Sequence, residues 1–156
     1  AALTGPATEE LQKNMALFET REFLECLHTQ DAVLGPAARR KALWHLSPNV
    51  RQQIAKDVAD SVLLLQMAQS RIQSRIEWDI PPKIVDWKYP GTRLFAAFQV
   101  VNRDPLGNET RVKHNMTLDG SFFTSTENRP SGFLVTRFTY VTDGRDLNTI
   151  LNKIGG

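Results

Sequence analysis

The segment Asn128-Arg-Pro-Ser-Gly-Phe-Leu-Val-Thr-Arg-Phe138 joins a turn to a strand-like run of residues. Pro130 holds its φ angle at about −65° and donates no backbone hydrogen bond, whereas Gly132 can adopt a positive φ angle. After the glycine, apolar Phe133 and Val135 alternate with polar side chains, which is typical of a strand with one buried face. The sequence therefore predicts a sharp turn that leads directly into the last strand of a sheet.

Helical patterns fill the first half of the chain. A first helix is predicted to begin with Thr8 as its N-cap, and Gly35-Pro36 interrupts the helical pattern before a short helix at 37–46. Ser47-Pro48 is a strong signal for a third helix start. The first helix carries an apolar stripe of Leu11, Met15, Phe18, Phe23 and Leu27. The third and longest helix has apolar residues at Val50, Ile54, Val58, Val62, Leu65, Ile72 and Ile76.

Strand patterns fill the second half. Pro81-Pro82 is predicted to end the helical region, and strands are predicted at 75–80, 83–89, 92–102, 110–118 and 133–142. Turn signals separate most of these strands, at Tyr89-Pro90-Gly91, at 104–108 and at Asp119-Gly120. The apolar run at 94–101 is expected to be a central strand that the long helix covers on one face. The tail at 143–156 is expected to form a short amphipathic helix, which docks either on its own domain or on a partner.

Helices first and strands second is the order of an α+β protein. We therefore predict one domain over residues 1–156, with N-terminal helices packed on a strongly curved antiparallel sheet. This architecture is that of the cone-shaped domains known as nuclear-transport-factor-like or cystatin-like.

The turn segment resembles the Asn-Pro-x-Gly-Phe-x-Val-Thr segment in the periplasmic domain of the eighth VirB protein, an assembly factor of bacterial type IV secretion systems. In this chain Arg129 lies between the Asn and the Pro, so the motif is one residue longer. The segment at 42–48 is also similar to the TraE-type pattern of a helix, a proline and a long helix. The matching residues of the turn motif are Asn128, Pro130, Gly132, Phe133, Val135 and Thr136.

The resemblance implies a protein that catalyses nothing and holds other proteins together. It implies an inner-membrane protein with a short cytoplasmic tail, one spanning helix and this domain in the periplasm. It also implies weak self-association, as a dimer or a larger homo-oligomer, and contacts with other components of the secretion channel, including contacts through the turn motif. A rigid turn lowers the entropic cost of binding, and Phe133 is either an anchor at such an interface or a core residue.

Charge argues against a dedicated nucleic-acid binder. The 156 residues contain 19 basic and 17 acidic side chains, a net charge of +2, whereas such binders usually carry a large basic excess. Any contact with the transported DNA is therefore expected to be weak. The local cluster Arg39-Arg40-Lys41 is interpreted as a solvated helix face, with an anionic partner as the alternative.

Cysteine content and hydropathy say little about the cellular compartment. Cys26 is the only cysteine, so it is read as a small core residue, with an intermolecular disulfide or a reactive thiol as the alternative. The chain has no apolar run of the roughly 20 residues that span a bilayer, and no signal peptide. It begins Ala1-Ala2-Leu3, without a methionine. We interpret it either as a mature product or as a piece of a longer protein that includes a membrane anchor.

Residues that carry catalysis or bind metals show no recognisable spacing. His28, His45 and His114 have no helical i, i+4 partner and no cysteine neighbours, so we predict no metal site and no cofactor. Cone-shaped domains also include small-ligand-binding proteins and isomerase-like enzymes, which place ionisable side chains in a cavity. For that alternative function the candidate side chains are Glu77, Asp79, Asp86 and Tyr140.

Overall fold

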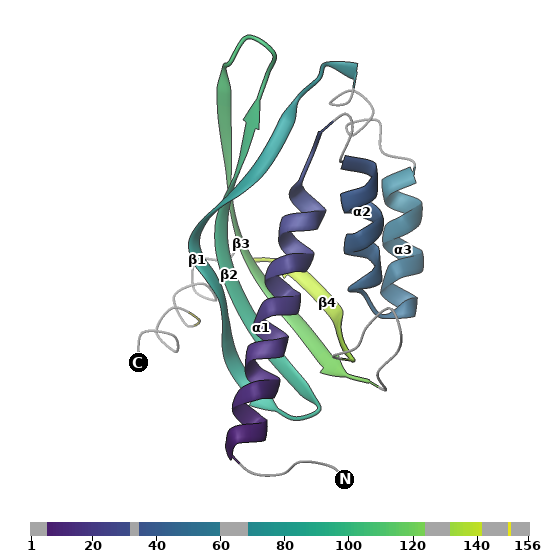
Figure 1. Cartoon of the computed structure of the whole chain (residues 1–156), viewed down its shortest axis with the longest axis vertical. Coiled ribbons are helices and arrows are strands. Elements are labelled where there is room, and N and C mark those ends of the chain that lie inside the picture. The colour runs from purple at the N-terminus through teal and green to yellow at the C-terminus, as the bar shows by residue number, and fades with distance from the viewer. Residues whose placement is uncertain (1–5, 32–34, 60–68, 124–131, 142–149, 151–156) are drawn as a thin grey trace.

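The computed structural model describes residues 6–31, 35–59, 69–123, 132–141 and 150 (Figure 1). Asn128 and Pro130 of the turn motif therefore lie outside the described residues. The predicted tail helix at 143–156 also lies outside them, apart from residue 150.

Among the described residues, three helices come first: α1 (Pro6–His28), α2 (Gly35–Trp44) and α3 (Pro48–Ala59). The start of α3 confirms the Ser47-Pro48 signal, and the Arg51 N–H donates to the Ser47 carbonyl oxygen (2.9 Å). Gly35-Pro36 begins α2 instead of preceding it, because proline is well tolerated in the first turn of a helix.

The long helix predicted from Ser47 to Ile76 is wrong at its C-terminal end. Ser70 and Arg71 form a turn, and Ile76 lies in the first strand. The helical spacing extended to Ile76 in the sequence because Val50 and Ile54 of α3 and Ile76 of β1 all pack against the same core. Ile76 is therefore apolar for its place in a strand, and not for a place in the helix.

The four strands are β1 (Gln73–Lys88), β2 (Gly91–Arg103), β3 (Glu109–Phe122) and β4 (Phe133–Tyr140). They form an antiparallel sheet in the order β1-β2-β3-β4. This order confirms the predicted α+β class with helices before a meander of strands. The strength of the curvature stays a prediction.

The predicted strands at 75–80 and 83–89 are a single strand, β1, and Pro81-Pro82 lies inside it. The β1–β2 register shifts between Ile80 and Lys83, which is where the two prolines lack an N–H group for the ladder. An edge strand tolerates this loss because only one side of it is paired within the sheet.

Asp119-Gly120 was also predicted as a turn, and it lies inside β3. The register between β3 and β4 shifts at this point. Gly120 has a packing role here, because a methyl group added at its Cα would overlap the aromatic ring of Phe133.

The helices lie on one face of the sheet, and α1 lies over it (Figure 1). The helix that covers the sheet is therefore α1, and not the third helix as predicted, although Val50 and Ile54 of α3 reach the same core. Cys26 packs against this core, in agreement with its reading as a small core residue. The buried members of the core are Ala16, Phe23, Leu24, Ala42, Leu46, Leu94, Ala96, Phe98, Val100, Met116, Leu118, Phe133 and Val135.

The predicted apolar stripe of α1 is only partly buried. Phe23 is fully buried, but the exposed fractions of Leu11 and Phe18 are 55% and 64%. None of the helices in the described part of the chain is both long and apolar enough to cross a membrane.

Candidate functional site

Gly132 forms the corner that leads into β4. Its φ angle is +72°, in the region that favours glycine, as the sequence predicted. Its carbonyl oxygen accepts a hydrogen bond from the Phe123 N–H (2.7 Å), so the corner is tied to the end of β3. Gly132 therefore has a fixed position relative to the sheet.

Phe133 lies in the core. Its exposed fraction is 0%, and its ring packs against the Cα of Gly120, where a side chain would not fit. The ring also meets the Phe122 ring edge-on, with 5.2 Å between centroids. The sequence left two interpretations of Phe133 open, an interface anchor or a core residue, and its buried position is that of a core residue. An effect of Phe133 on partner binding would therefore act through the shape of the corner.

Val135 and Thr136 connect β4 to the rest of the molecule. The Val135 N–H donates to the His45 carbonyl oxygen (2.7 Å), and the Ser47 N–H donates to the Val135 carbonyl oxygen (2.9 Å). The Thr136 hydroxyl donates to the Asp119 carbonyl oxygen (3.2 Å). The short segment between α2 and α3 thus pairs with β4 in parallel at Leu46 and Val135. We call this contact the β4 junction.

Two carboxylates from α1 meet His45 beside the β4 junction. Glu19 Oε2 lies 2.8 Å from His45 Nδ1, and Glu22 Oε2 lies 3.6 Å from His45 Nε2. His45 is only 1% exposed. Sequence reasoning treated His45 as an isolated histidine. The only signal in the sequence was the spacing of Glu19 and Glu22, which places them on one helix face.

The basic cluster at 39–41 is partly engaged within the domain. Arg39 donates a hydrogen bond to the Gln30 side chain, and Lys41 forms an ion pair with Glu22. Arg40 is exposed. This arrangement agrees with a solvated helix face, and it leaves little concentrated positive charge for an anionic partner.

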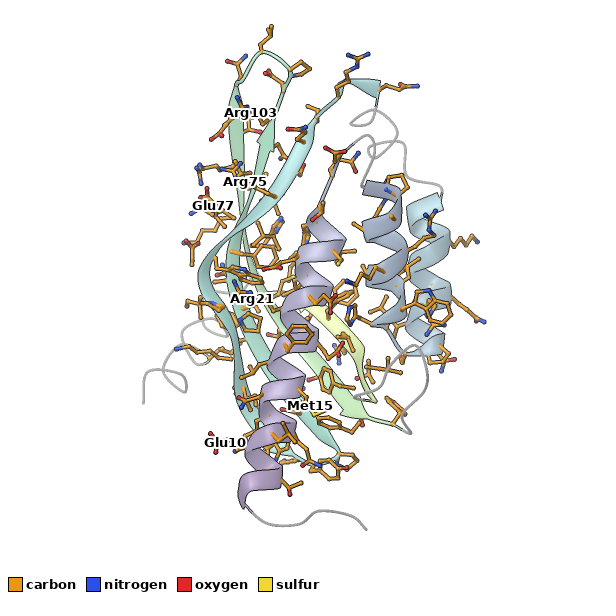
Figure 2. The ribbon with its side chains drawn as sticks, viewed as in Figure 1. Glu10, Met15, Arg21, Arg75, Glu77 and Arg103 are labelled. Carbon is orange, nitrogen blue, oxygen red and sulfur yellow. The ribbon has the colours of Figure 1, made fainter. Side chains whose placement is uncertain are left out.

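The carboxylates considered for catalysis do not converge. Figure 2 shows Arg75 and Glu77 on the side of the sheet away from the helices. Glu77 pairs there with Arg75 (3.0 Å) and with Arg111, whose hydrogen bond lowers the pKa of the Glu77 carboxyl. Asp79 and Asp86 are exposed on the same strand, β1. These groups are partners in surface ion pairs and hydrogen bonds, such as the bond that Gln99 donates to Asp79 (3.3 Å).

Tyr140, the fourth candidate, belongs to an aromatic cluster. Its ring lies 4.9 Å from His114, which stacks on His28 at 5.8 Å between centroids. Burial and the neighbouring His114 lower the pKa of His28 to about 4, and burial lowers the pKa of His114 and raises that of Tyr140. Both imidazoles are therefore neutral at pH 7.

A cavity of about 330 Å³ lies beside the two imidazoles. Arg39, Gln30 and Asn102 contribute polar side chains to it, and no carboxylate is among the described residues that line it. Among the described residues that line the cavity, the groups able to transfer protons are the stacked imidazoles of His28 and His114, with no carboxylate beside them.

Solved structures with this fold cover nearly the whole chain. An IcmL-like type IV secretion system protein from Legionella pneumophila is similar over 90% of this chain and 97% of its own, with 17% identity and a TM-score of 0.68. Agrobacterium tumefaciens VirB8 is similar over 92% of this chain and 99% of its own, with 12% identity and a TM-score of 0.66.

The periplasmic domain of DotI is similar over 92% of this chain and 99% of its own, with 12% identity and a TM-score of 0.68. No protein-family model matches the chain, and no curated protein sequence matches it. The chain therefore has the fold of the VirB8-like domains of type IV secretion systems.

Proposed function

We propose that this chain is the periplasmic domain of an assembly component of a type IV secretion system, and that it acts as a scaffold through protein–protein contacts. The observation that carries the proposal is the match of about nine-tenths of the chain to secretion components of the same fold. The turn motif adds support, because Gly132 adopts the positive φ angle expected for it from the sequence.

A binding role fits the chemistry of the domain better than a catalytic one. Glu77, Asp79 and Asp86 are not among the residues that line the cavity beside His28 and His114, and Glu77 is held in ion pairs with Arg75 and Arg111. Since fold alone does not fix function, this distribution of ionisable groups is what favours a scaffold over an enzyme.

The proposed location is the periplasm, with anchoring to the inner membrane by a segment outside the present sequence. The DotI structure, a periplasmic domain of the same fold, supports this location. The proposed partners are other channel components and further copies of the chain. The near balance of 19 basic and 17 acidic residues supports at most a weak contact with nucleic acid.

The exposed face of α1 is the surface that we assign to self-association. Leu11 and Phe18 are seven residues apart, so they lie on the same side of the helix, and both are more than half exposed. Apolar side chains aligned along a helix are a common form of protein–protein contact.

Sedimentation velocity over a range of concentrations tests this proposal. We expect the wild-type chain to show a concentration-dependent shift toward a dimer or larger homo-oligomer, and the Leu11→Ser/Phe18→Ser variant to sediment as a monomer over the same range. Leu106→Ser is the matched control, because Leu106 is 88% exposed at the tip of the β2–β3 hairpin, away from α1. A wild-type chain that stays monomeric at every concentration would count against self-association.

A further inference from the structure

One group of side chains in the described part of the chain has the composition and spacing of a metal site. It consists of Glu19 and Glu22 on α1 and His45 in the segment after α2. Each side chain offers one ligand atom, and the three atoms lie within 4.8 Å of one another. The two glutamates are three residues apart, so the helix directs both toward the same neighbour.

The second observation is the state of the histidine. His45 is 99% buried, and neither ring nitrogen has a hydrogen-bond partner of good geometry among the described residues. The carboxylates are nevertheless next to the ring, with Glu19 Oε2 2.8 Å from Nδ1. Buried polar atoms without partners cost free energy, and such atoms in a native protein often indicate an ion or a water molecule. The ring is therefore aimed at the carboxylates without being satisfied by them.

We propose that Glu19, Glu22 and His45 bind a divalent transition-metal ion of the Zn²⁺ type. Imidazole together with carboxylate suits zinc and its neighbours, whereas Ca²⁺ and Mg²⁺ prefer oxygen ligands alone. Zinc bound at roughly 2.0–2.2 Å in tetrahedral geometry holds its ligand atoms about 3.3–3.6 Å apart. We expect rotation of the side chains on metal binding to bring the three atoms from within 4.8 Å to that spacing. Three protein ligands leave a fourth position for water.

Charge around the cluster favours a dication. The two carboxylates are close together, and Lys41 forms an ion pair with one of them, Glu22. Lys41 thus offsets part of the negative charge that the two carboxylates place next to the buried ring. A bound ion would compete with Lys41 for the Glu22 carboxylate. The measured affinity for the ion is therefore reduced by the free energy of the Lys41–Glu22 ion pair.

The position of the site gives metal binding a structural consequence. His45 follows α2, and its carbonyl oxygen accepts the hydrogen bond from Val135 at the β4 junction. An ion held by Glu19, Glu22 and His45 would tie α1 to the segment that pairs with the last strand. The site does not depend on the proposed secretion function. It differs from the prediction of no metal, which considered only ligands near one another in the sequence.

Calorimetric titration of the chelator-treated 156-residue chain with ZnCl₂ tests the proposal. We expect one Zn²⁺ per chain, a rise in the melting temperature on binding, and no equivalent binding of MgCl₂. Glu22→Gln should weaken Zn²⁺ binding by at least about tenfold. Glu10→Gln is the matched control, because Glu10 is an exposed glutamate near the start of the same helix (Figure 2).

Absorption of the Co²⁺-loaded wild-type chain gives a second readout that does not depend on the folding of a variant. Strong visible bands of tetrahedral Co²⁺ in the wild-type chain support the site. Absence of saturable Zn²⁺ binding, equal affinity in the Glu22→Gln and Glu10→Gln variants, or the weak absorption of six-coordinate Co²⁺ would each overturn it.

Discussion

Single residues fix the corner that begins the last strand. Gly132 supplies the positive φ angle, and Gly120 leaves room for the ring of Phe133. The two glycines therefore serve different purposes, one for backbone conformation and one for close packing. The sequence motif identifies the first of these glycines, but nothing in the sequence identifies Gly120 as the residue under the Phe133 ring.

His28 gives the domain a pH dependence that is also a property of one residue. Burial lowers its folded-state pKa to about 4, so below its unfolded pKa of 6.5 the unfolded chain binds a proton that the folded chain excludes. The contribution of the neutral His28 to the free energy of unfolding is therefore fully present above pH 6.5. It is lost as the pH falls toward 4. We expect the free energy of unfolding to fall by about 2 kcal/mol between pH 7 and pH 5.

Urea denaturation at pH 7, 6 and 5 measures this loss. His28→Gln should reduce the dependence on pH, because glutamine does not titrate. His114→Gln is the comparison, since the pKa of His114 is lowered in the same direction by burial. An unchanged loss of stability in His28→Gln would show that other groups cause it.

At the scale of elements, the β4 junction holds the last strand to the helices. Val135→Pro removes the N–H that donates to His45, and it should destabilise the domain by about 1–3 kcal/mol. Hydrogen exchange should also become faster at the Ser47 amide, which donates to the Val135 carbonyl oxygen. Val135→Ala is the control that keeps the N–H. Equal protection of the Ser47 amide in the proline and alanine variants would show that the junction does not depend on this bond.

Elements with strong local signals were predicted well from the sequence. Ser47-Pro48 gave the start of α3, the apolar run at 94–101 lies within β2, and the glycine of the turn motif precedes β4. Errors occurred where tertiary packing overrode the local sequence signal. Pro81-Pro82 is a break in helical patterns, but an edge strand accommodates it at a register shift.

The candidate metal site was beyond sequence reasoning for a related reason. Glu22 and His45 are separated by all of α2, and the fold of α1 against that helix brings them together. Helical spacing aligns Glu19 with Glu22, but no local rule places His45 next to them.

At the scale of the whole molecule, the described helices lie on one face of an antiparallel meander, and this fold is that of solved domains of type IV secretion components. Identities of 12–17% over about nine-tenths of the chain mean that the fold is kept while most surface residues differ. Partner specificity is therefore expected to reside in features particular to this chain, such as the exposed Leu11 and Phe18 on α1.

Cross-linking mass spectrometry of the natural full-length protein in membranes of its own cell tests the scaffold role most directly. We predict cross-links from this domain to other copies of itself and to the periplasmic parts of secretion-channel proteins. Recovery of the protein in the cytosol, or cross-links to none of the channel components in membranes where those components cross-link to one another, would contradict it.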